Sequence, residues 1–413
     1  MINRQNLITF LFKWSFLLFI FVLSFSSSFK FSNLLPLPLF FLFLSLLFYS
    51  FKSITKSKYE LNVNFESKIL IFFIIMQSIH LLIFTNFDPI SLRHYTIFIF
   101  LLFVFIEITP SLINEISFKS FININFLAVL FVAVICILEF FLVFFDFRLT
   151  DYLFRFDQSM AYYHNATDEV FKPTKVLFRS VAFSTEPIQV GYYLLSLGPL
   201  AFLINNKYKK YFPYIFLILI LGIISTLSSI SLFILFLNIV VLFFYLIYFR
   251  FYRHFVYLLF TLLIIFFVTI NSHYSFVYED IVGKIFLDTD FKSVDQRLSY
   301  LKLYINYFIE NPYFGMGAGY FSKAGYPSAI NFYITFLATY GIIHFLILIY
   351  LFIYIYYISM KKQLNTTTKI ILSHAFFNST IFLFFLSTYW NLFHFVILSL
   401  LLYISRNNGK ILN

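Results

Sequence analysis

The segment FININFLAVLFVAVICILEFFLVFF, residues 121–145, is long and apolar enough to cross the hydrocarbon core of a bilayer as one helix. Similar runs recur along the 413 residues, of which 61% are hydrophobic and 11% charged, and the mean hydropathy is +0.89. A soluble domain carries roughly a quarter charged residues, so the side chains that would cover a water-facing globule are missing. The sequence therefore predicts an all-α integral membrane protein.

Apolar runs divide the chain into about twelve transmembrane helices, if each crossing takes about twenty residues. The predicted spans are 10–29, 34–51, 68–87, 93–113, 121–145, 180–204, 211–227, 229–249, 254–271, 330–358, 368–386 and 389–405. The stretch 211–249 has the least marked division, because only the patch Ser225-Thr226-Leu227-Ser228-Ser229 offers a turn. A single crossing cannot use that length, so we expect two helices there.

Lysine and arginine alternate between the two sides of these spans, as they do when positive residues collect in cytoplasmic loops. The loops predicted to lie inside hold Lys52, Lys56, Lys58, Lys119, Lys207, Lys209, Lys210, Arg250, Arg253, Lys361, Lys362, Lys369, Arg406 and Lys410. The short outside loops hold only Lys30 and Arg93. The pattern predicts a single multi-pass domain, 1–413, with both termini in the cytoplasm. It also accounts for the net charge of +11 without a nucleic-acid partner.

Two long loops, 146–179 and 272–329, both fall outside, and the larger comes late in the chain. Within 272–329 the apolar residues Leu298, Leu301, Tyr304, Ile305 and Phe308 recur at helical spacing, which predicts an amphipathic helix on the outer face of the membrane. Asn311-Pro312 should end it, because the residue before proline avoids the helical region. Gly315 and Gly317 then permit a tight loop whose amides can face an anion, although this glycine pattern also fits an ordinary turn.

A second candidate site begins at Arg179 and enters the span 180–204. Arg179 and Glu186 are seven residues apart, so they share one face if the segment is helical. A carboxylate in a span is costly and usually functional, and Pro187 should kink or break the helix beside it. A structural Glu-Arg pair beside a proline kink is the alternative interpretation.

Further cations lie in the outer loops, among them Arg155, Lys175 and Lys323. Guanidinium groups grip phosphate with two hydrogen bonds and lysine adds point charges, so a basic outward vestibule suits a pyrophosphate head group. Solvated loops are the alternative, because the same segments also carry carboxylates. The histidines show no metal-ligand spacing, so we expect no metal and no cofactor. The single cysteine, Cys136, excludes an internal disulfide.

The chain resembles the bacterial O-antigen polymerase and ligase superfamily at three segments. The first runs from Arg179 to Glu186-Pro187, and the second runs from Arg297 along a helix into Glu310-Asn311-Pro312-Tyr313-Phe314-Gly315-Met316-Gly317. The third is Ser328-Ala329-Ile330-Asn331-Phe332-Tyr333, which opens a span that continues through Thr339-Tyr340-Gly341. The late, large outer loop is also similar to the family, and these short motifs cover about a fifth of the chain.

This resemblance implies a glycosyltransferase in the bacterial inner membrane with an outward-facing active site. The donor would be an oligosaccharide on undecaprenyl pyrophosphate, which a polymerase passes to the next lipid-linked repeat unit of an O-antigen, capsule or exopolysaccharide. Catalytic roles fall on Arg179, Glu186 and Arg297, and substrate binding falls on Lys323, Lys175, Arg155, Gly315, Gly317 and Asn331. Membrane lipid, a chain-length regulator and a flippase are the implied partners.

Besides a non-catalytic membrane scaffold, two other functions remain open. The ligase branch of the superfamily transfers finished chains to lipid A core and carries a His-Asn pair where the late loop meets the next span. This sequence reads Ile330-Asn331 there, which favours the polymerase. A lipid-linked oligosaccharide flippase also fits twelve spans, but transporters are usually built from two related halves with short loops. No internal repeat is visible here.

Overall fold

The structure is a computed structural model that describes residues 4–25, 30–32, 35–56, 64–85, 88–142, 182, 187–204, 210–226, 228–248, 292–326, 331–386 and 392–407. Helices make up most of these residues, and a short antiparallel pair, β1 (Lys30–Ser32) with β2 (Leu35–Pro36), joins the first two helices. The chain divides into two compact units, and each is described by itself. Unit 1 comprises 1–129, 196–212 and 296–413, and unit 2 comprises 130–195 and 213–295.

The described helices fall into those before and those after the first long loop. Those before the first long loop are α1 (Arg4–Phe21), η1 (Leu23–Phe25), α2 (Leu37–Lys56), α3 (Phe65–Thr85), α4 (Pro89–Phe103), the π-helical turn η2 (Val104–Ile108), α5 (Thr109–Ile116) and α6 (Phe118–Leu142). The later ones are α9 (Pro187–Leu197), η4 (Gly198–Leu203), α10 (Phe212–Ser225), α11 (Ser229–Tyr248), α14 (Lys292–Glu310), α15 (Tyr320–Lys323), α16 (Phe332–Met360), α17 (Thr366–Phe382) and α18 (Leu392–Arg406).

Four helical stretches in the described part are long and apolar enough to cross a membrane. They are Phe65–Thr85, Pro89–Ile116, Phe118–Leu142 and Phe332–Met360. A helix also lies at each of the other predicted spans, apart from 254–271, which lies outside the described residues. The predicted all-helical class is thus confirmed, and the apolar helices are those expected of a membrane protein. The number of crossings stays a prediction.

Polar residues fix where several helices begin. The Asp88 side chain accepts hydrogen bonds from the amides of Ile90 and Ser91, both at 3.1 Å, and Pro89 occupies the first position of α4. The Asn331 side chain caps α16 in the same way by accepting from the amide of Ile334 at 3.0 Å. Such caps satisfy amides that the first helical turn leaves without partners.

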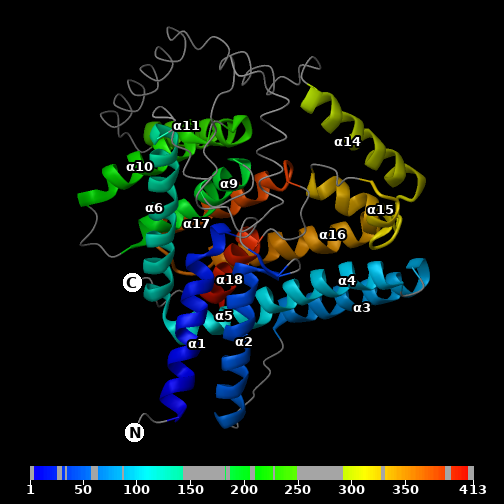
Figure 1. Cartoon of the computed structure of the whole chain (residues 1–413), viewed down its shortest axis with the longest axis horizontal. Helices are drawn as coiled ribbons and strands as arrows, with labels where there is room; N and C mark the ends of the chain where they lie inside the picture. Colours follow the sequence, from blue (N-terminus) through cyan, green and yellow to red (C-terminus); the bar gives the residue numbers. More distant parts are fainter. Residues whose placement is uncertain are drawn as a thin grey trace. The chain divides into compact units, whose positions relative to one another are not determined.

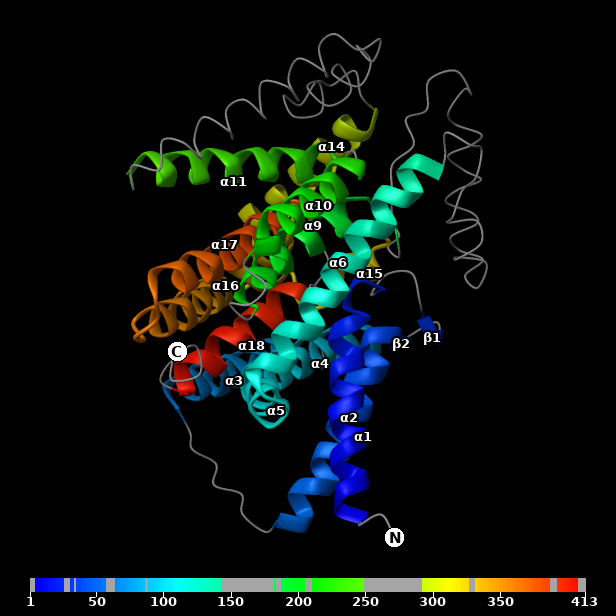
Figure 2. The same cartoon turned by 90° about the vertical axis from the view of Figure 1, so that its left-hand side faces the viewer.

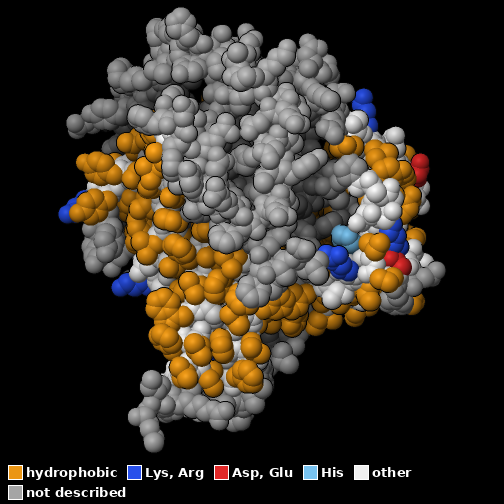
Figure 3. Space-filling model, in the orientation of Figure 1, with side chains coloured by type: hydrophobic (Ala, Val, Ile, Leu, Met, Phe, Trp, Pro, Cys, Tyr) orange, Lys and Arg blue, Asp and Glu red, His pale blue; other side chains and the backbone are white. Residues whose placement is uncertain are grey.

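Helix contacts in unit 1 bring segments from both ends of the chain together. Helices α1 and α2 lie side by side, and α3 packs against α4 and α16 (Figures 1 and 2). Helix α18 contacts α5, α16 and α17 and is buried along nearly its whole length. A helix that is apolar all round belongs in a core, which explains its sequence. Apolar side chains cover α1 and α2 in Figure 3, as lipid-facing helices require.

Unit 2 relies on small residues for close helix contacts, as membrane helices often do. A Cβ atom added to Gly222 of α10 would lie 2.9 Å from Cα of Ala133 in α6, and one on Gly191 of α9 would overlap Oγ of Ser231 in α11. The predicted turn between α10 and α11 is confirmed, because α10 ends at Ser225 and α11 begins at Ser229.

Ion pairs in unit 1 join residues that the sequence assigns to the same side of the membrane. Lys52 contacts Glu115 at 2.6 Å, and Arg406 contacts Glu66 at 3.2 Å and Glu107 at 3.3 Å. Lys52, Glu66, Glu115 and Arg406 belong to helix ends predicted to face the cytoplasm, and Glu107 lies in the span 93–113, in the half nearer that side. The pairs therefore agree with the alternation of loop charges within this unit.

Candidate functional site

Helix α16 is broken at Gly341, and a loop from the preceding segment fills the break. Gly341 has φ 74° and ψ 178°, which no helical residue adopts. Residues 311–317, here called the docked loop, hydrogen-bond to both sides of the break. The amides of Met316 and Gly317 donate to the carbonyls of Ala338 and Thr339, each at 2.9 Å, and the amide of Ile342 donates to the carbonyl of Pro312 at 2.8 Å.

Glycines allow the two backbones to approach this closely. A Cβ atom on Gly341 would lie 2.2 Å from the carbonyl oxygen of Tyr313, and one on Gly315 would lie 2.5 Å from the carbonyl carbon of Thr339. Both glycines also have positive φ. The glycine pattern of the docked loop thus serves backbone contact with α16.

The end of α3 and the start of α4 hold the same segment from another side. Nε2 of the buried His80 donates to the carbonyl of Phe314 at 2.5 Å, and the hydroxyl of Ser91 donates to the carbonyl of Ala318. The His80 ring also contacts His344 of α16, with 5.0 Å between ring centroids. Side chains from α3, α4 and α16 therefore fix the docked loop and the residues that follow it.

Lys323 forms an ion pair with Asp88, the residue that caps α4. Desolvation acts to raise the pKa of the Asp88 carboxyl, but hydrogen bonds from Lys323 and Ser91 and the charge of Lys323 outweigh it. The pKa of Asp88 therefore lies well below its usual range. Charged side chains gather at this edge of unit 1, where α4 begins and α15 ends, and Figure 3 shows them among apolar neighbours.

Replacing Asp88 with asparagine should reveal this ion pair through its pH dependence. Asparagine keeps the helix cap but loses the charge. Because the folded pKa of Asp88 is lowered, its stabilising contribution is complete above the unfolded pKa of about 4 and is lost as the pH falls below it. We expect the variant to unfold about 1–3 °C below the wild type at neutral pH. The gap should begin to narrow below about pH 4 and close only as the pH falls through the lowered pKa of folded Asp88; a gap that does not narrow as the pH is lowered would contradict this assignment.

Helix α14 ends at Glu310, where Asn311-Pro312 predicted its end. Its apolar face packs on the protein, because Tyr304 is buried against Phe321 of α15 and Ala338 of α16. The rings of Tyr304 and Phe321 stack with 4.1 Å between centroids. The predicted helix at the outer membrane face is thus held at this position by α15 and α16.

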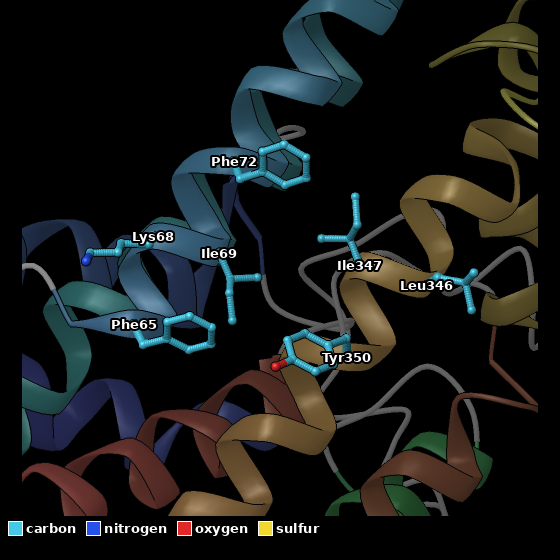
Figure 4. A pocket seen from close by; sticks show the side chains of 7 residues that line it. All are labelled: Phe65, Lys68, Ile69, Phe72, Leu346, Ile347 and Tyr350. Atoms are coloured by element: carbon cyan, nitrogen blue, oxygen red, sulfur yellow. The ribbon is translucent and has the colours of Figure 1, made fainter.

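An apolar groove of about 450 Å³ lies between α3 and α16. Figure 4 shows Phe65, Ile69 and Phe72 of α3 facing Ile347 and Tyr350 of α16 across it. Leu346 lines its far end, and the Lys68 side chain extends from α3 away from α16. Phe72, Leu346 and Tyr350 are more than half exposed. Both helices are candidate spans, so the groove has the lining expected of a surface in contact with lipid chains.

The structure describes one of the three predicted catalytic residues. Arg179 and Glu186 lie outside the described residues, as do Arg155 and Lys175. Arg297 lies on α14, as predicted. The convergence of Arg179, Glu186 and Arg297 on one cavity therefore stays a prediction.

The break predicted at Pro187 coincides with the start of the described helix, and the part of the span 180–204 before it lies outside the described residues, apart from Ala182. The helix begins at Pro187, and Ala182 has φ 42°, outside the right-handed helical region. Proline is favoured at the first position of a helix. An amide N–H at that position would have no partner within the helix, so its absence costs nothing. Ala182 thus does not have a right-handed helical conformation, and a shared face for Arg179 and Glu186 stays a prediction.

The predicted binding residues Gly315, Gly317, Lys323 and Asn331 are all described, and each has a protein partner. The amide of Gly315 donates to Asn311 at 2.9 Å and that of Gly317 to Thr339, so these amides are already engaged. Lys323 pairs with Asp88, and Asn331 caps α16. Substrate binding by these four residues stays a prediction, and an anion bound here would need other donors.

The residues that hold the docked loop were not found from the sequence. Asp88-Pro89 carries a recognisable signal, because an aspartate before a proline is typical of a helix start. His80 and Ser91 carry none, since a polar residue in an apolar helix does not reveal which distant carbonyl it meets.

No protein-family model and no curated protein matches this chain. The functional interpretation therefore depends on its own residues. The described part holds no group of three or more His, Cys, Asp or Glu residues able to bind a metal ion. In the described part, backbone hydrogen bonds join the docked loop, which follows α14, to α16. The Lys323–Asp88 ion pair lies beside this junction.

Proposed function

We propose that this protein is a polysaccharide polymerase of the bacterial inner membrane. It transfers a growing glycan from undecaprenyl pyrophosphate to the next lipid-linked repeat unit. In this proposal the chain crosses the membrane about twelve times, keeps both termini in the cytoplasm and works on the outer leaflet. The loop charges and the apolar helices support that arrangement.

The observation that carries the proposal is the docking of residues 311–317 into the break of α16. Two of the segments that resemble the polymerase and ligase superfamily, 310–317 and 339–341, meet there through backbone hydrogen bonds. Asn331, which belongs to the same segment as 339–341, caps the start of that helix. Motifs that are separate in the sequence thus belong to one assembly, which is what a shared site requires.

The chemistry needs cations and a proton acceptor. A hydroxyl oxygen of the acceptor sugar attacks the anomeric carbon of the growing chain, the bond from that carbon to the pyrophosphate oxygen breaks, and undecaprenyl pyrophosphate leaves. Arg179 and Arg297 would stabilise the charge on the leaving group, with Lys323 in support. Glu186 would take the proton from the attacking hydroxyl.

The apolar groove between α3 and α16 also favours a lipid-linked substrate or a lipid-embedded enzyme. Its lining of Phe65, Ile69, Phe72 and Ile347 suits an isoprenoid or acyl chain. Asn331, at the position of the ligase-type His-Asn pair, caps a helix and follows an isoleucine. This favours transfer to another repeat unit over transfer to lipid A core.

A lipid-linked oligosaccharide flippase is the second candidate, and the break in α16 favours it. Discontinuous membrane helices commonly form transporter binding sites. In this chain the break is filled by the docked loop, whose amides satisfy the carbonyls of Ala338 and Thr339. The polymerase therefore remains the better supported function.

Deleting the gene tests the choice among these functions in cells. We expect long glycan chains to disappear while single repeat units remain on the carrier or its acceptor, as seen by gel and mass analysis of the carrier lipid. Normal long chains on the carrier without transfer to lipid A core would indicate the ligase. Loss of outward-facing repeat units would indicate the flippase. Either result would overturn the polymerase.

A further inference from the structure

A compact group of tyrosines covers the surface where α14 meets α15. Tyr307 of α14 lies at its centre, with ring centroids 5.6 Å from Tyr320 and 5.9 Å from Tyr326. The Phe321 ring lies 5.4 Å from Tyr307 and closes the group from below, where it is buried. Tyr307, Tyr320 and Tyr326 are here called the tyrosine platform.

The rings of the tyrosine platform are held in fixed positions relative to one another. The hydroxyl of Tyr307 donates to the hydroxyl of Tyr326 at 3.1 Å, and the Tyr307 ring meets those of Tyr320 and Phe321 edge-on. Phe321 in turn stacks on the buried Tyr304. Rings fixed before a ligand arrives lose little conformational entropy on binding.

Small, polar and charged residues follow Phe321 along the chain. Ser322, Lys323, Ala324 and Gly325 are all exposed, and a Cβ added to Gly325 would meet nothing within 4 Å. The Lys323–Asp88 ion pair adds charge beside the rings. Tyrosines of a membrane-interface belt would instead have exposed apolar neighbours, as Tyr313 has in Phe314.

Aromatic faces beside polar hydrogen-bonding groups fit a carbohydrate better than a lipid or an anion. A sugar ring has an apolar C–H face that packs on an aromatic ring and a rim of hydroxyls that need donors and acceptors. Tyrosine offers both in one side chain. The adjacent Lys323 is matched by Asp88, so the surface does not favour a polyanion.

We propose that the tyrosine platform binds the neutral sugar rings of the glycan that is being extended, with Tyr326 as its exposed stacking residue. The inference rests on the proposed polymerase function, because it assigns a surface to that enzyme's glycan. It adds a binding surface in the described part of the late outer loop, apart from the cations that would hold the pyrophosphate.

Saturation-transfer NMR on the full chain in nanodiscs of deuterated lipid tests the platform. The probe is the host cell's own surface glycan, released from its lipid by mild acid and therefore without pyrophosphate. Irradiating the aromatic protons of the wild type should transfer saturation to sugar C–H protons. Tyr326→Ala should weaken glycan binding on the order of tenfold, while Tyr326→Phe should keep most of it.

Tyr214→Ala is the matched control, because Tyr214 of α10 is an exposed tyrosine outside the platform and the groove, and it should bind like the wild type. Equal glycan binding by wild type and Tyr326→Ala would overturn the platform. If the wild type nevertheless forms polymer, the proposed function stands although the platform is rejected. If Tyr326→Ala loses glycan binding but the wild type does not polymerise repeat units, the binding surface is supported and the polymerase is rejected.

Discussion

Replacing Gly341 with alanine is expected to remove most of the folded protein from the membrane. Gly341 has φ 74° and ψ 178°, a region that essentially only glycine occupies. The added Cβ would also lie 2.2 Å from the carbonyl oxygen of Tyr313 and 2.4 Å from the amide nitrogen of Phe314. Backbone strain and overpacking together should cost about 2–6 kcal/mol of folding free energy.

Gly325→Ala is the matched control for this variant. Gly325 also has a positive φ, at 70°, but a Cβ there meets nothing within 4 Å. Only the strain of the left-handed conformation should remain, at about 1–2 kcal/mol. The measurement is the amount of monodisperse protein and its unfolding midpoint after detergent extraction. Equal losses for the two variants would show that docking of the loop in the break does not hold this part of the fold together.

Arg297→Lys is expected to abolish most polymer while the protein still inserts normally. In the proposed mechanism Arg297 must hold a pyrophosphate through paired hydrogen bonds, which a lysine cannot reproduce. Loss of a positioned donor to a developing charge typically lowers kcat by about a hundredfold to a thousandfold. Arg179→Lys should behave in the same way, and Glu186→Gln should reduce activity more than expression.

Lys302→Gln supplies the control on the same helix, because Lys302 is an exposed cation of α14 with no assigned role. It should leave chain length and yield unchanged. The measurement is the glycan ladder of cells that express each variant at equal membrane abundance. Full-length polymer from all three site variants would reject the proposed catalytic residues, even if the deletion phenotype were that of a polymerase.

The helices could be predicted because their signals are local. Apolar length placed α3, α6 and α16 within a few residues, and Asn311-Pro312 gave the end of α14. The turn predicted at the serine patch between α10 and α11 was also correct, because the apolar stretch 211–249 is too long for a single crossing. The first residue of α9 is Pro187, where the proline predicted a break, because proline carries a local signal that an apolar run does not.

The contacts that build the site could not be predicted from the sequence. The glycines of the docked loop suggested an anion-binding turn, but the amide of Gly317 donates to the carbonyl of Thr339 in α16 and that of Gly315 donates to the carbonyl of Asn311. That pairing depends on the break at Gly341, and a lone glycine in an apolar run does not reveal a break. Lys323 similarly gave no sign of its partner Asp88, which is 235 positions away.

Reconstitution of the purified protein tests the polymerase most directly. Vesicles would contain the protein and undecaprenyl-pyrophosphate-linked repeat units, with no other enzyme, and the products would be separated by mass. The proposal predicts a ladder whose steps equal one repeat unit, together with release of one undecaprenyl pyrophosphate for each step. Single repeat units that cross the bilayer without being joined would contradict it and identify a flippase instead.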